Sequence, residues 1–147
     1  MKVNITYWND RIGGTLVKKT VDAYNYFYKV GPAGSWQMVV ADEEKTVQAN
    51  VVTNIKINKI VIPEESIIFP CSVMRHALGF VVSVVSLGKP KKIEEQRIID
   101  EVLFYPIHNG MICKGDLLGV MNVLYAHPEH ELLEDSVISW LKERCRY

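Results

Sequence analysis

The stretch PCSVMRHALG, residues 70–79, places a thiol, a guanidinium and an imidazole between two strongly apolar segments. Arg75 could fix a carboxylate or a phosphate through its forked donors, and His76 could act as an acid or a base near neutral pH. The alternative is that Arg75 pairs with a surface acid and His76 packs at a strand end. We take this stretch as a candidate ligand site for a small anion, formed by Arg75 and His76 with help from His108 and Cys71.

The cysteines and histidines also raise the question of a metal. Cys71 and His76 are separated by four residues, and His108 and Cys113 repeat that separation in reverse order. Zinc accepts such ligands, but structural zinc sites use closer cysteine pairs, and residues five apart point to opposite faces of a strand. We therefore predict no metal site. Phosphate-binding loops of the Walker or dinucleotide kind are absent, and we predict no cofactor.

Composition limits the class of protein. The chain has 147 residues, with 17 basic and 17 acidic side chains and a formal net charge of zero. This balance disfavours a nucleic-acid partner, and no stretch approaches the roughly 20 apolar residues of a membrane span. The length is that of one domain, so we expect a single domain covering residues 1–147. Three cysteines in a chain without an export signal indicate reduced thiols, so we expect this domain to be cytoplasmic.

Alternation of apolar and polar residues predicts a mainly β protein. It is clear in Met1–Trp8 and in Val51–Asn58, the pattern of an antiparallel strand with one solvated face. In Glu101–Tyr125, apolar runs are separated by turn residues, which predicts strands that meet at hairpin turns. The valine-rich Phe80–Leu87 has few polar positions and predicts a central strand buried on both faces.

The C-terminal region changes period. From about residue 129 to 146, apolar residues recur at a spacing of three to four, acidic residues occupy the early turns, and basic residues occupy the last turn. This pattern predicts an amphipathic α-helix. The expected fold is thus a small antiparallel barrel or barrel-sandwich, closed or flanked by that helix. A buried Trp140 would place the helix on the core, whereas an exposed Trp140 would indicate an oligomer.

Two motifs together, CSVMRHALG and GMICKGDLLGVMNV, resemble the archaeal domain-of-unknown-function family 22. The family shows a similar arginine-histidine-alanine segment and a similar lysine-glycine-aspartate hairpin. The resemblance covers residues 36–125 and leaves the N-terminal strands and the C-terminal helix unmatched. It implies an archaeal, cytoplasmic, β-rich domain and adds weight to Arg75 and His76 as site residues, but it implies no activity.

The leading functional hypothesis is a non-catalytic binding or assembly module that forms a homo-oligomer. Apolar and aromatic residues are abundant, charge is balanced, and catalytic motifs are missing. Tyr24, Tyr26 and Tyr28 share one face of a predicted strand, and an aromatic stripe of this kind is typical of core or interface packing. The alternative is an enzyme or a small-anion-binding protein with a pocket around Arg75 and His76.

Overall fold

The computed structural model describes residues 1–29, 33–85 and 87–126, apart from the side chains of residues 73–75. Within these residues the chain forms eleven strands and no helix, so no helix there could cross a membrane. The predicted helix at 129–146 and its Trp140 lie outside the described residues. The strands are β1 (Lys2–Trp8), β2 (Leu16–Asp22), β3 (Tyr26–Lys29), β4 (Ala33–Val40), β5 (Lys45–Val47), β6 (Thr53–Ile62), β7 (Ser66–Arg75), β8 (Gly79–Val84), β9 (Arg97–Pro106), β10 (Gly110–Ile112) and β11 (Leu117–Tyr125).

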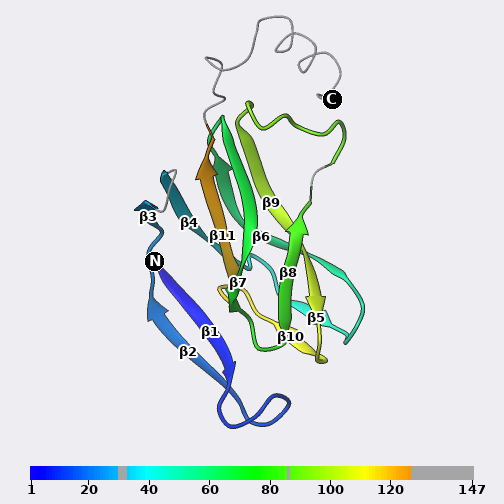
Figure 1. Ribbon diagram of the computed structural model, residues 1–147. Coiled ribbons are helices and arrows are strands. Elements are labelled where there is room, and N and C mark those ends of the chain that lie inside the picture. Colours follow the sequence, from blue (N-terminus) through cyan, green and yellow to red (C-terminus); the bar gives the residue numbers. More distant parts are fainter. Residues whose placement is uncertain (30–32, 86, 127–147) are drawn as a thin grey trace, which may run out of the picture.

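The strands form two sheets and two ribbons, and every ladder is antiparallel (Figure 1). The four-stranded sheet has the order β3-β4-β11-β7, and the three-stranded sheet has the order β6-β9-β8. The ribbons are the N-terminal hairpin β1-β2 and the short pair β5-β10. The prediction of a mainly β, antiparallel protein is therefore confirmed.

The main core lies between the inner faces of the two sheets. Val39, Met121 and Val123 come from the four-stranded sheet, while Ile55 and Phe104 come from the three-stranded sheet. All five side chains are buried. The alternation in β6, interrupted where its register shifts between Lys56 and Ile60, produces this packing, because residues two apart share one face of a strand and the apolar set points inward.

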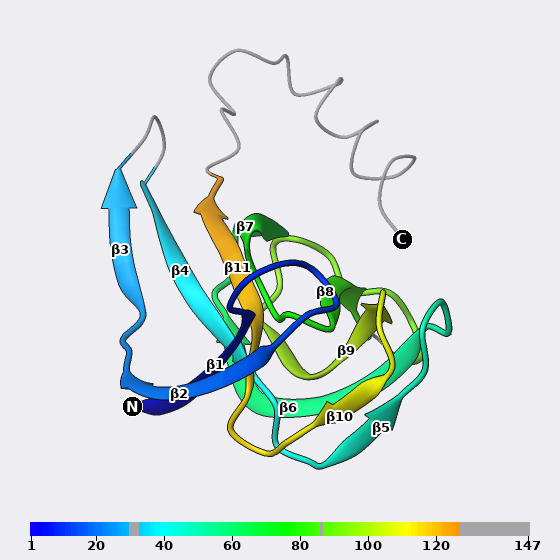
Figure 2. The ribbon, with the colours of Figure 1, turned by 90° about the horizontal axis from the view of Figure 1, so that it is seen from below.

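A second, smaller core lies on the outer face of the four-stranded sheet. Val3 of β1 packs there against Met38, Val40 and Leu117. Figure 2 shows the N-terminal hairpin crossing β4 and β11 at this place. The hairpin therefore covers one part of the outer face of this sheet.

The predicted barrel is wrong, because the two sheets do not close into one. β7 and β8 are the edge strands of different sheets, and no ladder among the described residues joins them. β8 is also not the predicted central strand, since Phe80 and Val82 on it are exposed. The expected hairpins in 101–125 are absent too, because β10 pairs with β5, and β11 pairs with β4 and β7. These pairings join segments far apart in the chain, and local periodicity does not specify them.

Candidate functional site

The four predicted site residues lie on or next to two turns. Arg75 ends β7, where its backbone stands opposite Gly119, and its side chain is outside the described part of the structure. His76 begins the turn that leads to β8, and the Gly79 N–H donates to the His76 carbonyl at 3.1 Å. His108 follows β9, and Cys71 lies within β7.

The His76 side chain is buried, with 1% of the residue exposed. The Leu78 N–H donates to His76 Nδ1 at 3.1 Å, so the neutral ring carries its proton on Nε2. That nitrogen faces Asp116 Oδ2 at 3.5 Å. The ring also lies edge-on to Phe104, with centroids 6.2 Å apart. The geometry gives His76 a structural contact with Asp116 and no open path to solvent.

Asp116 is the centre of this arrangement and is fully buried. Lys18 Nζ lies 2.9 Å from one carboxylate oxygen and 3.1 Å from the other, and the Cys113 N–H donates to Oδ2 at 2.9 Å. Burial by itself raises the pKa of Asp116, but the hydrogen bonds from His76, Cys113 and Lys18 outweigh it, and the pKa lies below its usual value. The carboxylate is therefore ionised in the folded protein at neutral pH.

Lys18 is the cation of the cluster and is part-exposed, with 38% of its side chain accessible. Burial acts to lower its pKa, but hydrogen bonds to Asp116 and Cys113 and their charges raise it above the usual value. Thr6 lies directly opposite Lys18 in the hairpin and is buried. Lys18, Asp116 and His76 thus form a polar cluster that joins three separate parts of the chain.

Asp116 and Lys18 are not among the site residues predicted from the sequence. For Asp116 the sequence does carry a signal, since a carboxylate directly before the apolar run Leu117–Met121 indicates burial with a partner. Lys18 carries no such signal, because a lysine in an alternating strand is ordinarily solvated. Its role depends on where the hairpin docks, which is a tertiary feature.

His108 and Cys71 lie in other surroundings. The His108 ring meets Trp8 edge to face at 5.2 Å, and Trp8 Nε1–H donates to the Ala77 carbonyl at 3.0 Å. The first contact holds the N-terminal hairpin against the segment after β9, and the second holds it against the segment after β7. Cys71 instead lines a cavity between β7 and β8. Within the described residues, no group of three or more histidine, cysteine or acidic side chains is arranged to hold a metal ion.

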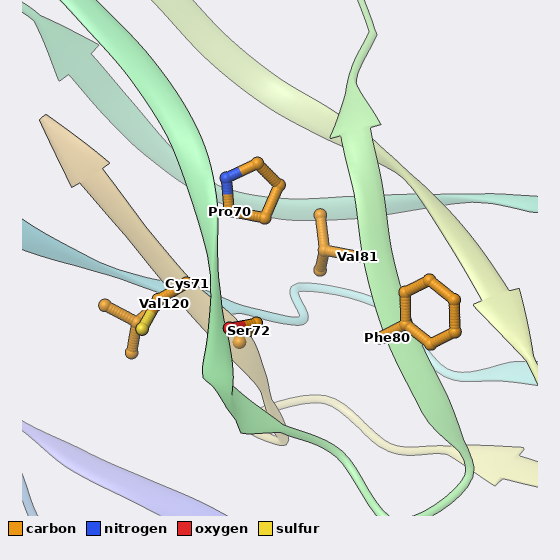
Figure 3. Close-up of a pocket in the computed structure, with 7 residues that line it drawn as sticks. Pro70, Cys71, Ser72, Phe80, Val81 and Val120 are labelled. Atoms are coloured by element: carbon orange, nitrogen blue, oxygen red, sulfur yellow. The ribbon is translucent and has the colours of Figure 1, made fainter.

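The cavity beside Cys71 has a volume of about 430 Å³ (Figure 3). β7 contributes one wall, β8 the other, and β11 lies behind them. Its lining residues are Pro70, Cys71, Ser72, Phe80, Val81, Gly119 and Val120. Cys71 is thus a predicted site residue that lines a cavity, and a ligand-binding role for Cys71, Arg75, His76 and His108 stays a prediction.

Comparison with known proteins gives a family. The family described as domain of unknown function DUF22 matches residues 2–110, which is most of the chain. The chain belongs to this family. The resemblance found in the sequence is confirmed, but its limits differ: in this DUF22 chain the match includes the N-terminal hairpin and ends before β11.

A curated relative comes from an archaeon. This DUF22 chain is 34% identical over 88 residues to the uncharacterized protein MJ0614 of the archaeon Methanocaldococcus jannaschii. The aligned region covers 60% of this chain and 67% of the relative. No solved structure matches the chain.

Proposed function

We propose that this domain is a non-catalytic assembly module that forms a homo-oligomer through one face of the four-stranded sheet. The main support for this proposal is an apolar patch on the outer face of that sheet, beyond the part that the N-terminal hairpin covers. We call it the assembly face. Its residues, placed on one side by the strand register, are Tyr26, Tyr28, Trp36, Ile67, Phe69, Asn122 and Leu124.

Exposure of large apolar side chains supports this proposal. Tyr26 is 47% exposed, Ile67 is 40% exposed and Phe69 is 45% exposed. They come from the two opposite edge strands of the sheet, β3 and β7, so the patch extends over its full width. An apolar patch that spans a sheet is typical of a protein interface.

The aromatic rings of the assembly face are ordered by contacts with one another. Tyr26 and Trp36 pack with ring centroids 4.8 Å apart. Tyr28 lies across Gly34, where an added Cβ would come within 2.8 Å of the tyrosine ring, and its hydroxyl donates to Asn122 Oδ1 at 3.4 Å. Rings already held in place lose little freedom on binding, which favours association.

The outer face of the other sheet differs in charge. Exposed Val61 and Ile98 stand opposite each other there, but the charged side chains of Lys56, Lys59 and Asp100 are exposed on the same strands. No charged residue belongs to the assembly face as defined above. This asymmetry favours association through one sheet only. Cys71 and Cys113 are free thiols, which supports the cytoplasmic setting that we include in the proposal.

The test compares charge substitutions on the two outer faces of the full chain. Phe69→Lys on the assembly face is matched by Val61→Lys on the three-stranded sheet, because the two side chains have similar exposure, 45% and 50%. Native mass spectrometry and light scattering give the subunit count, and circular dichroism checks the fold. We expect an oligomeric wild type, a monomeric Phe69→Lys variant and an unchanged Val61→Lys variant.

Two outcomes would overturn this proposal. The first is a monomeric wild type at micromolar concentration. The second is an oligomer that survives Phe69→Lys, since a buried lysine pair at a shared apolar interface would be strongly unfavourable. A monomeric wild type that loses thermal stability with Phe69→Lys would instead indicate that the same chain covers the face.

A further inference from the structure

An interruption in strand pairing creates the cavity beside Cys71. Met121 of β11 stands opposite Pro70 of β7, and the next paired position, Gly119, stands opposite Arg75. Residues 71–74 of β7 therefore face only Val120 on β11. Because the extra residues cannot pair, β7 must arch away from its neighbour.

The arch faces β8, the edge strand of the other sheet. Figure 3 shows Pro70, Cys71 and Ser72 on β7, with Phe80 and Val81 across the gap on β8. Proline has no N–H, so position 70 cannot donate to a ladder. The cavity occupies the seam that a closed barrel would have filled with hydrogen bonds.

The side chains that line the cavity indicate which kind of ligand it could bind. The lining residues named above include no charged side chain, and their polar side-chain groups are the Cys71 thiol and the Ser72 hydroxyl. A charged ligand would lose its hydration there without gaining a counter-charge from these described lining residues. Apolar walls with one or two polar groups are typical of sites for small organic molecules, and a volume of about 430 Å³ is within their range.

We infer that the seam between β7 and β8 is a binding site for a small, uncharged and mainly apolar molecule, such as a neutral aromatic compound. A partner β-strand is a poorer occupant, because adding a strand requires a regular edge with unpaired backbone groups in a row. β7 is arched here, and the β8 ladder shifts register between Val81 and Ser83. Phe69, on which the assembly proposal is tested, is not among the lining residues of this site.

The first measurement uses the neutral fluorophore N-phenyl-1-naphthylamine as the probe. We expect saturable binding with one site per chain. Ser72→Phe should weaken binding at least about tenfold, because the new ring would occupy the cavity. Ser83→Phe is the matched control, since Ser83 is also an exposed serine, lies on β8 and is not among the lining residues. It should bind the probe as the wild type does.

The second measurement needs no variant. Alkylation by N-ethylmaleimide, followed by site-resolved mass spectrometry, reports the rate at Cys71, which lines the cavity, and at Cys113, which does not. The probe should slow alkylation of Cys71 several-fold and leave Cys113 unchanged.

Three results would overturn the inference: no saturable binding, equal effects on the two cysteines, or full binding by Ser72→Phe. Probe binding that is lost in Phe69→Lys but kept in Ser72→Phe would place the probe on the assembly face instead. Failure of the site and failure of the assembly proposal are therefore distinguishable, because one is read from the probe and the other from subunit count.

Discussion

At the scale of single residues, Asp116 connects three parts of the chain through one carboxylate. Lys18 reaches it from β2, His76 from the turn after β7, and the Cys113 N–H from its own turn. A buried carboxylate is stable only when such partners replace its lost hydration. The cluster therefore stabilises the folded state, and it fixes the N-terminal hairpin beside the segment that contains His76.

Removing the charge of Asp116 should cost stability in a pH-dependent way. At pH 7 we expect Asp116→Asn to lower the free energy of unfolding by on the order of 2 kcal/mol, because buried charge-assisted hydrogen bonds are lost. The folded-state pKa is lowered, so this stability is present above the unfolded-state value of about 4 and is lost as pH falls through the folded-state pKa. Urea unfolding at neutral and at acidic pH measures the effect.

Asp42→Asn is the control for that experiment. Asp42 also pairs with a lysine, at 2.9 Å from Lys114, but both side chains are exposed. Its loss should change stability by less than about 0.5 kcal/mol. If Asp116→Asn cost the same at both pH values, the effect would come from packing and not from charge.

At the scale of elements, the N-terminal hairpin is a separate unit docked onto the sheets. Besides its polar cluster, it is held by the second core around Val3 and by backbone hydrogen bonds from Asn4 to Gly115 and from Ala77 to Thr6. The main core between the sheets takes only a peripheral contribution from it, at Trp8. This division suggests that the hairpin opens before the sheets do.

Val3→Asp should undock the hairpin and leave the sheets folded. Val3 is 1% exposed, and an unpaired carboxylate at that place would cost several kcal/mol. We expect amides in β1 and β2 to lose protection in hydrogen exchange, while amides in β6 and β9 stay protected. Val82→Asp, at an exposed position on β8, should change neither set. Loss of protection throughout the chain would show that the hairpin and the sheets fold as one unit.

At the scale of the whole molecule, the two sheets differ in how much apolar surface their outer faces expose. The four-stranded sheet carries apolar side chains on both faces, and the N-terminal hairpin covers only part of the outer one. The sequence has no net charge, so long-range repulsion between copies is weak. Both features agree with self-association by apolar contact.

The proposed self-association should depend little on salt. Between about 0.05 and 0.5 M NaCl, we expect the dissociation constant of the oligomer to change by less than about threefold, because the assembly face as defined contains no charged side chain. Analytical ultracentrifugation across this range measures it. If the oligomer dissociated much more readily at high salt, its interface would consist of ion pairs and would lie on a surface other than the assembly face.

Part of this structure could be predicted from the sequence. Alternation identified β1 and β6, because a strand with one buried face repeats every two residues. The turn residues expected within Glu101–Tyr125 include Gly115, which adopts a φ of +89° in the structure. The family resemblance is confirmed, and the motif CSVMRHALG lies within the matched residues 2–110, whereas the motif GMICKGDLLGVMNV begins where the match ends. These features depend on neighbouring residues, which is why the sequence alone determined them.

The tertiary structure decided how the strands pair and what their ends contact. The apolar run of β8 suggested a central strand, yet it forms an edge, because neighbours in a sheet are chosen by long-range packing. The partnership of Lys18 with Asp116 spans 98 positions. The cavity beside Cys71 depends on four unpaired residues of β7 meeting the edge of another sheet. Such sites form only when segments distant in the chain pack together, and local sequence patterns do not predict which segments will do so.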